Sequence, residues 1–328
     1  MYEAAIEISS RRVRLASRKE GIKLDTSSAG AYREDRLIAI GGTAEEMTGR
    51  VPAAIRIKYP VEHGSIACVD LCTEWLTRLL KPFTGVSVKL TKPDILFVDT
   101  GLTDSAKEFI SARCDELGAG KVTFLSAGIT AALGARCPVM KPEATVLLDI
   151  GACSMDGYVL AYGSVVKETH IPYGTDSLND EIRRRVLEKC NLKIGNAEAE
   201  NLKHIILTSA PSSKLTAEAE GISTKTGFPV KQTVSSEDIF TSFTYITAIA
   251  RQMVASLLSS LPEGLAAEAG EGGIMLTGGG ALLPSFAKGL SDLTGIQFHR
   301  PEEPLQCTIR GAYRIISEKA LEEILLPN

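Results

Sequence analysis

The chain has 328 residues, of which 44% are hydrophobic and 23% charged, and its formal net charge is -4 at pH 7. This length and composition suit a globular protein with two domains, each large enough to bury a core. Because the balance is slightly acidic and no long basic run occurs, nucleic acid is excluded as a main partner.

The cysteines and the N-terminus indicate where the protein works. Seven cysteines are scattered along the chain, their number is odd, and no C-x-x-C pair occurs. This usage is typical of a reduced, cytoplasmic protein. The start, MYEAAIEISSRRVRLAS, lacks the apolar core of a signal peptide, and no run reaches the length of a membrane span. We therefore expect a cytoplasmic protein whose membrane contact, if it has one, is peripheral.

The first half begins with a strand, a tight turn and a strand over Ala4–Ser17. A strand and a short helix follow in DRLIAIGGTAEEMTGR, and Asp70–Phe83 has the apolar spacing of a helix. PDILFVDTG predicts a buried strand, and TDSAKEFISARCDELGAG a helix with Thr103 or Asp104 as its cap and a glycine stop. KVTFLSAGITAALGA predicts a strand followed by a small-residue helix.

The second half opens in the same way, with a hairpin over Thr145–Val166. Helices are predicted over TDSLNDEIRRRVLEKCN, capped near Asp176, and over NAEAENLKHIILTSA. AEAEGISTKTGFPVKQTVSS predicts a hairpin, and the long helix after it starts at a capping sequence. SFAKGLSDLTG and CTIRGAYRIISEKALEEIL predict two further helices. Since strands alternate with helices, the class is α/β, built from two related halves.

The triplet Gly278–Gly280 lies between an apolar run and a helical pattern. Glycines between a strand and a helix let a ligand approach the backbone N–H groups. A tight packing turn is the alternative, and the triplet alone does not decide between the two.

The turn after Asp149 has a similar character, because Gly151 is followed by the small residues Ala152, Cys153 and Ser154. A strand-end carboxylate beside such a turn suits a phosphate cradle with Mg²⁺ bound to Asp149 through water. The alternative is an ordinary hairpin.

Glu200 and Lys203 lie three residues apart and share one face of their predicted helix. They are either a solvated surface pair or groups that flank a ribose and a base.

At this point the sequence resembles the MreB family of bacterial actin-like cell-shape proteins over nearly its whole length. The resemblance is strongest in five segments that occur in the same order as in the family. They are AIGGTAEEMTGRVPAAIRIKYPVEHGSIA, CNLKIGNAEAENLKHII, TGFPVKQTVSSEDI, GGIMLTGGGALLPSFAKGLSDLTGI and EEPLQCTIRGAYRII.

The resemblance implies an actin-like fold of two lobes, each a five-stranded mixed sheet with flanking helices, with ATP or ADP and Mg²⁺ bound in a cleft between them. The first lobe would span 1–140 with a small subdomain at about 31–64, and the second 141–328 with one at about 175–245. The implied nucleotide residues are Ser10, Arg11, Arg12, Asp149, Gly151, Ala152, Cys153, Ser154, Glu200, Lys203, Gly278, Gly279, Gly280, Ala281 and Leu282.

The sequence departs from the family pattern in the loops that would hold the phosphates of the nucleotide. The first phosphate loop reads Glu7-Ile8-Ser9-Ser10-Arg11-Arg12, and a serine at position 9 would carry a steric cost if φ were positive there. The two arginines either add positive charge for phosphates, or they fill the pocket or point outward into solvent.

The family positions its attacking water with glutamates just before the small-residue helix, where this chain has Ser126 and Ala127. Ala152, Cys153 and Met155 also depart from the second-loop pattern. Loss of a water-positioning group commonly costs about 10² to 10⁴ in rate. We therefore expect weak or absent hydrolysis, and the catalytic residue stays unassigned.

The segment 81–93, KPFTGVSVKLTKP, falls where the family has a membrane loop, and it mixes apolar and lysine side chains. It is either an inner-membrane contact or a plain helix-to-strand connection. The resemblance further implies self-assembly into antiparallel or paired protofilaments, and other cell-shape proteins as partners.

The function implied is that of a nucleotide-binding cytoskeletal protein whose membrane-associated filaments organise the cell wall and cell shape. The alternative is a non-polymerising pseudo-ATPase that regulates or caps such filaments or scaffolds another complex. An enzyme such as a sugar kinase is disfavoured, because no aspartate can be assigned to a sugar hydroxyl.

Overall fold

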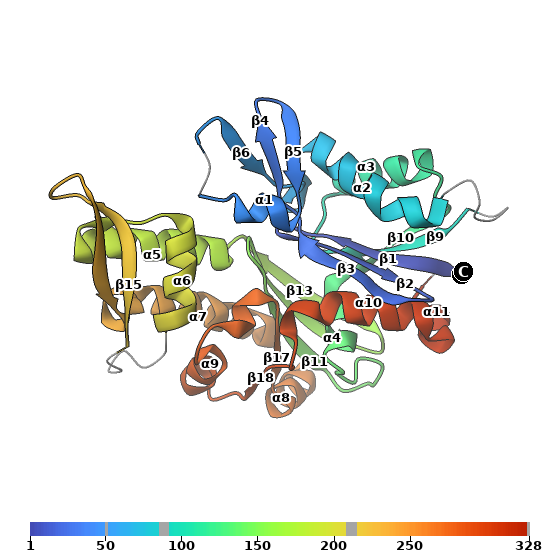
Figure 1. Ribbon diagram of the computed structural model, residues 1–328. Helices are drawn as coiled ribbons and strands as arrows, with labels where there is room; N and C mark the ends of the chain where they lie inside the picture. The colour runs from blue at the N-terminus through green and yellow to red at the C-terminus, as the bar shows by residue number, and fades with distance from the viewer. Residues whose placement is uncertain (50–51, 85–91, 208–214, 327–328) are drawn as a thin grey trace. The chain divides into compact units, whose positions relative to one another are not determined.

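The protein is described by a computed structural model covering residues 1–49, 52–84, 92–207 and 215–326 (Figure 1). Its contacts divide the chain into two compact units. The first comprises Met1–Pro142, Leu160–Val165 and Gln306–Asn328, and the second Glu143–Val159 and Val166–Leu305. The lobe and subdomain boundaries given by the resemblance stay a prediction.

A five-stranded sheet in the order β10-β9-β1-β2-β3 forms the centre of the first unit. β1 pairs antiparallel with β2 and parallel with β9, so the sheet is mixed. The middle strands are almost wholly buried because helices cover the sheet. The strands are β1 (Tyr2–Ile8), β2 (Arg12–Ser17), β3 (Gly21–Ser27), β9 (Asp94–Asp99) and β10 (Val122–Ser126).

The helices of the first unit come from distant parts of the sequence. α2 supplies Leu71, Leu76 and Leu80 to the core on the strands, and α10 packs closely against α4. The helices are α2 (Val69–Thr84), α3 (Asp104–Glu116), α4 (Ala127–Gly134), α10 (Cys307–Ser317) and α11 (Lys319–Leu325).

Two small sheets complete this unit, one in the order β5-β4-β6 and one made by β7 and β8. Their strands and the short helix beside them are β4 (Gly30–Arg33), β5 (Arg36–Ile40), β6 (Ile55–Lys58), β7 (Val61–Glu62), β8 (Ser65–Ile66) and α1 (Gly42–Glu46).

The second unit also has a five-stranded sheet, in the order β13-β12-β11-β17-β18. β11 runs parallel to β17, and β17 to β18. The tip of the β12–β13 hairpin is grouped with the first unit. The strands are β11 (Thr145–Ile150), β12 (Met155–Ala161), β13 (Ser164–Ile171), β17 (Ile274–Thr277) and β18 (Phe298–His299).

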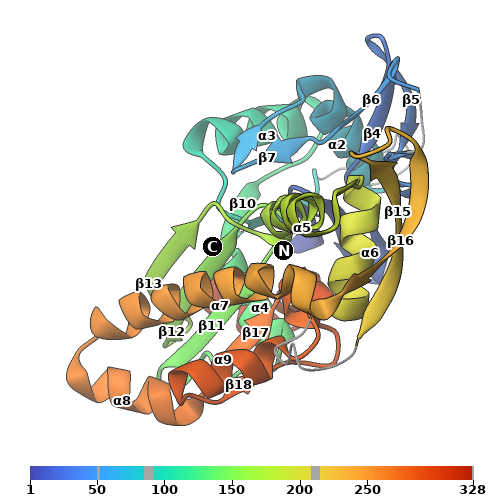
Figure 2. The ribbon, with the colours of Figure 1, turned by 90° about the vertical axis from the view of Figure 1, so that its left-hand side faces the viewer.

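A long helix, α7, lies along this sheet (Figure 2). A Cβ atom at Gly157 of β12 would lie 2.5 Å from Leu257 Cδ1 and 3.0 Å from Met253 Sδ, so the glycine lets α7 approach the strand. The helices of this unit are α5 (Thr175–Cys190), α6 (Asn196–Ile206), α7 (Ser236–Ser259), α8 (Glu263–Gly272), α9 (Phe286–Thr294) and the 3₁₀ turns η1 (Gly279–Leu282) and η2 (Pro304–Gln306).

A three-stranded sheet, β14-β15-β16, lies beside α6 (Figure 2). Its strands are β14 (Leu192–Lys193), β15 (Thr216–Ser223) and β16 (Pro229–Ser235). The predicted α/β class, the two opening hairpins and the capping box of α7, formed by Ser235 and Asp238, are all confirmed.

Three local predictions were wrong. The C-terminal helix is two helices, because Glu318 takes extended backbone angles between α10 and α11. The N-cap of α5 is Gly174, with no side-chain cap bond, rather than a residue at Asp176. α8 was not predicted, since its small, glycine-bearing sequence has weak periodicity.

The crossing of α10 over α4 leaves no room for side chains at two glycines. A Cβ atom at Gly311 would lie 1.7 Å from the carbonyl oxygen of Thr130, and one at Gly134 would lie 1.9 Å from that of Cys307. The two helix backbones therefore touch directly.

We expect Gly311→Ala to lower the free energy of unfolding by about 1–3 kcal/mol, because the added methyl forces the helices apart. Urea unfolding followed by circular dichroism measures the change. Gly264→Ala in α8 is the control, since nothing lies within 4 Å of its Cβ position, and it should be neutral or stabilising by up to about 1 kcal/mol. Equal stability of Gly311→Ala and wild type would contradict the direct backbone contact.

Candidate functional site

The glycine triplet of the second unit follows β17 and is shaped mainly by the packing of its turn on β11. Gly278 has φ 77°, and a Cβ atom there would lie 2.4 Å from the carbonyl oxygen of Ile150. A Cβ atom at Gly280 would lie 2.2 Å from Ile150 Cγ2. Only Gly279 has room at its side, with Leu305 Cδ2 at 3.5 Å. The packing interpretation therefore holds for Gly278 and Gly280, and the interpretation of the triplet as a ligand site stays a prediction.

Asp149 lies directly beside this turn. Its partner across the β11–β17 pair is Thr277, whose hydroxyl donates a hydrogen bond of 2.6 Å to Asp149 Oδ1. The structure thus brings the predicted metal-side carboxylate and the predicted glycine turn together. Ala281 is buried in η1, and Leu282 is half-buried.

The turn from Gly151 to Ser154 is closed by a hydrogen bond from the Gly151 N–H to the Ser154 carbonyl, 2.8 Å long. The first N–H groups of α5 donate to this turn, from Thr175 to Gly151 O and from Asp176 to Ala152 O, at 3.0 and 2.9 Å. These two donors are therefore committed to the protein. Cys153 Sγ lies 3.9 Å from Asp176 Oδ2.

Two residues that the sequence analysis missed extend this turn. Ser154 Oγ donates to Asp156 Oδ2 at 2.7 Å, and Asp156 Oδ1 lies 2.6 Å from Nδ1 of His170 on β13. The hydrogen bond with Asp156 raises the pKa of His170, and partial burial opposes the rise. The alternation of side chains on β12 and β13 is the only signal that could have paired them.

Glu200 and Lys203 form a close ion pair on α6. Lys203 is buried, and its Nζ donates to Glu200 Oε2 at 2.7 Å. Asn179 Nδ2 of α5 donates to the same oxygen at 2.6 Å, and His204 Nε2 lies 3.0 Å from Oε1. Burial alone would raise the pKa of Glu200, but these hydrogen bonds and the Lys203 charge lower it to about 2. Glu200 is therefore a fixed carboxylate rather than a mobile surface group.

In the first unit, the β1–β2 turn carries Ser9 and Ser10. The Ser9 N–H donates to the Arg12 carbonyl at 2.9 Å, and Ser28 Oγ donates to the Ser10 carbonyl at 3.1 Å. Ser9 does not have a positive φ. The steric cost that the sequence suggested for this serine therefore does not arise.

Both arginines of this turn have partners within the first unit. The guanidinium of Arg11 lies 3.6 Å from the centre of the Tyr59 ring and 3.9 Å from Glu62 Oε1. Arg12 donates to Asp25 Oδ1 from Nε and Nη2, at 3.1 and 2.6 Å. Stacking and pairing of this kind are typical of arginine. The two guanidinium groups would have to leave these partners to contact a phosphate.

Below the turn, Glu7, Arg14 and Asp25 form a cross-strand ladder. They face one another in the β1–β2 and β2–β3 registers, and Arg14 reaches Glu7 Oε1 at 2.5 Å and Asp25 Oδ1 at 3.1 Å. Glu7 and Arg14 are 2% and 4% exposed, so this is a buried ion pair. Thr308 of α10 donates to Glu7 Oε2 at 2.5 Å.

Ser126 is the N-cap of α4, where its Oγ accepts a hydrogen bond of 3.2 Å from the Gly128 N–H. Ala127 is buried behind it. The position that the resemblance assigns to a glutamate is thus a capping serine here, and no carboxylate occurs in Ser126–Gly134.

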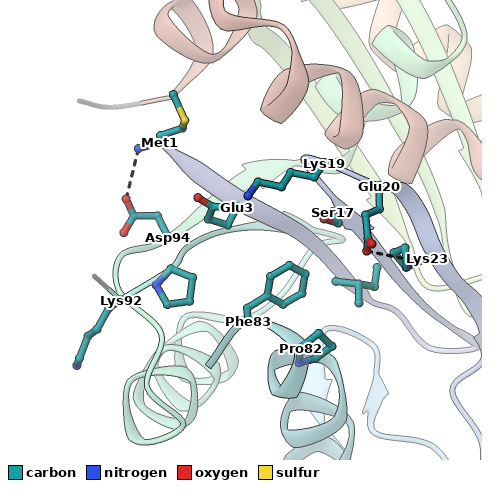
Figure 3. A pocket seen from close by; sticks show the side chains of 12 residues that line it. Met1, Glu3, Ser17, Lys19, Glu20, Lys23, Pro82, Phe83, Lys92 and Asp94 are labelled. Carbon is teal, nitrogen blue, oxygen red and sulfur yellow. Dashed lines mark ion pairs between the residues drawn. The ribbon is translucent and has the colours of Figure 1, made fainter. Parts of the chain in front are cut away.

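A cavity of about 590 Å³ lies in the first unit where α2 ends (Figure 3). Phe83, Pro82 and Pro93 form apolar parts of its wall, and Lys92 lies at its rim. These residues belong to the two ends of the predicted membrane segment 81–93, whose central part, 85–91, lies outside the described residues. None of the predicted nucleotide residues lines this cavity.

In the part of the chain that the structure describes, no group of three or more His, Cys, Asp or Glu side chains is arranged to hold a metal ion. No helix there is long and apolar enough to cross a membrane.

Comparison with known proteins identifies the class. The MreB5 structure of Spiroplasma citri bound to AMPPNP has a TM-score of 0.90 at 24% identity, covering 98% of each chain. The MamK double helical filament has a TM-score of 0.79 at 17% identity, covering 96% of this chain and 98% of that one. The fold is actin-like, with a five-stranded mixed sheet and flanking helices in each unit, as the sequence predicted.

The family profile described as MreB/Mbl protein matches residues 2–323. The cell shape-determining protein MreB of Escherichia coli is 29% identical over 331 residues, covering 98% of this chain and 94% of that protein. Mbl of Bacillus subtilis is 26% identical, covering 94% of each. The chain belongs to the MreB/Mbl family, as the resemblance predicted.

Arg14→Met should lower the free energy of unfolding by about 3–5 kcal/mol, because it leaves Glu7 buried without its counter-charge. Chemical denaturation measures the loss. The control is Arg78→Met, which breaks an exposed pair with Glu74 and should cost at most about 1 kcal/mol. Similar losses in the two variants would show that the ladder is not a buried pair.

Proposed function

We propose that this MreB/Mbl-family protein binds ATP or ADP, assembles into filaments and takes part in determining cell shape. The observation that carries the proposal is the family match over residues 2–323. Curated relatives are named cell shape-determining proteins, MreB5 has been solved with AMPPNP and with ADP, and MamK as a double helical filament. These names support a second copy of this chain as its partner.

The residues of the second unit fit a nucleoside. A Cβ atom at Gly279 would meet Leu305 Cδ2 at an ordinary contact distance of 3.5 Å, and we propose that the nucleoside approaches the backbone of η1 there. Glu200 accepts from three groups, and a carboxylate has about four acceptor positions, so capacity for a ribose hydroxyl remains. We assign Gly278–Leu282, Glu200 and Lys203 to the nucleoside, and Gly151–Ser154 to the phosphates.

Asp149 is suited to hold the water shell of Mg²⁺, since hard cations prefer oxygen ligands and usually keep several waters. When bound, the ion supplies positive charge that offsets the phosphates. The hydrogen bond from Thr277 fixes the Asp149 carboxylate for that role.

The proposal includes weak hydrolysis. Arg11 and Arg12 are engaged within the first unit, and the start of α4 offers a capping hydroxyl where a carboxylate would orient water. Nucleotide would then act as a bound structural element with slow turnover. We keep Ser10, Arg11 and Arg12 in the first phosphate loop and propose that only their backbone groups contact the nucleotide.

We further propose that the protein is cytoplasmic, that it works with other cell-shape proteins, and that segment 81–93 contacts the inner membrane. The apolar side chain of Phe83 and the charge of Lys92, at the two ends of that segment, support the membrane contact.

Gly279→Arg should abolish binding of a fluorescent ATP or ADP analogue, because the large side chain fills the space beside η1. Fluorescence anisotropy of the wild type and the variant, with Mg²⁺, measures this. Gly264→Arg is the control, because that glycine is in the same unit and its Cβ position is open. Unchanged affinity in Gly279→Arg would place any nucleotide elsewhere.

Filament formation is tested by high-speed sedimentation with and without ATP and Mg²⁺, with the pellets inspected by electron microscopy. We expect filaments in the pellet and little phosphate release while they assemble, because the start of α4 has no carboxylate to orient water. A soluble monomer under every condition would refute the assembly part of the proposal.

A further inference from the structure

A carboxylate lies against the turn that we assign to phosphates. Asp156 is 15% exposed, and its Oδ2 accepts the Ser154 hydroxyl at 2.7 Å. A hydroxyl has one proton to donate. While Ser154 donates to Asp156, it has no proton left for a phosphate oxygen, and the nearby negative charge repels an anion.

One imidazole offsets this charge. His170 Nδ1 lies 2.6 Å from Asp156 Oδ1, and its side chain is 51% exposed, so it can exchange protons with solvent. When His170 is protonated, the pair is neutral. When His170 is neutral, Asp156 carries a full charge beside the turn.

No other hydrogen bond or ion pair among the described residues brings a further charged side chain to Asp156 or His170. Asp156 is the ionisable group in hydrogen-bond contact with His170. The other titratable or charged side chains on β11, β12 and β13, in the turn and at the start of α5 are Asp149, Cys153, Tyr158, Lys167, Glu168 and Asp176. Lys167 is the single cation in this set, and among the described ion pairs His170 is the partner of Asp156.

We propose that Asp156 and His170 set the anion affinity of the Gly151–Ser154 turn, with protonated His170 permitting phosphate binding and neutral His170 opposing it. This inference rests on the proposed nucleotide function. It assigns to these residues a positioning role, exerted through Ser154 and through local charge, rather than a catalytic one.

The direction of the pH dependence follows from the pair. The hydrogen bond with Asp156 raises the pKa of His170 above its usual 6.5. The protonated form therefore dominates below that raised pKa and is lost as pH rises through it. Nucleotide affinity should be highest on the acidic side and fall across this transition, and the pair's contribution to folding stability is lost in the same window.

The test is the Kd of a fluorescent ADP analogue with Mg²⁺ from about pH 5.5 to about pH 8.5. Wild type should weaken by about threefold to tenfold across the range, as expected for one charge near a protein surface. His170→Gln should bind weakly at every pH, and Asp156→Asn tightly at every pH, both without the transition. His299→Gln, in the same unit, is the control that should keep the wild-type profile.

A second readout uses the protein without nucleotide. The chain has four histidines, so the His170 signal in NMR is assigned by its loss in His170→Gln. Its pKa should return to about 6.5 in Asp156→Asn. A raised pKa together with the same binding profile in wild type and His170→Gln would overturn this inference and leave the proposed function intact. No binding at any pH would overturn both.

Discussion

The buried ion pair between Glu7 and Arg14 constrains the first unit more than any other contact. A charge in an apolar interior is stable only with a partner, so the registers of β1, β2 and β3 must keep Glu7, Arg14 and Asp25 in line. Arg12 donates a further hydrogen bond to Asp25, and Thr308 donates one to Glu7, so both carboxylates have several partners. The turn above the ladder thus presents backbone and hydroxyl groups, because Arg12 is paired with Asp25 in the sheet and Arg11 lies against Tyr59 and Glu62 outside it.

In the second unit, close approach between backbone segments shapes the turns beside the ion pair of buried Lys203 with Glu200. Gly278 and Gly280 let the turn after β17 rest on Ile150, and Gly174 lets α5 rest on Ala152. α5 then connects the phosphate-side turn at its first residues with Glu200, which it reaches through Asn179. One helix therefore couples the phosphate side and the nucleoside side of the site within a single unit.

Much of the fold could be predicted because its signals are local. Short apolar strands flank the turns of both hairpins, α7 begins with its capping box, and Thr103 caps α3 through its own side chain. The ladder could not be predicted, since Glu7 and Asp25 meet only through the register of three strands. Nor could the break at Glu318, because the sequence there keeps a helical pattern. The site residues found from resemblance lie in short sequence motifs, whereas Asn179, Thr277 and His170 reach their partners only through packing.

The direct crossing of α10 over α4 also bears on how the chain folds during synthesis. Glu7 and Thr308, which share a hydrogen bond in the first unit, are separated by 301 residues. The second unit needs only residues 143–305 to complete its core, so those residues can pack while the first unit still lacks α10. Until residues 306–325 leave the ribosome, α10 cannot cover the pair Glu7–Arg14 or the face of α4 on which it packs. The first unit is therefore completed only after the second has been synthesised, and apolar surface left exposed until then is prone to aggregation.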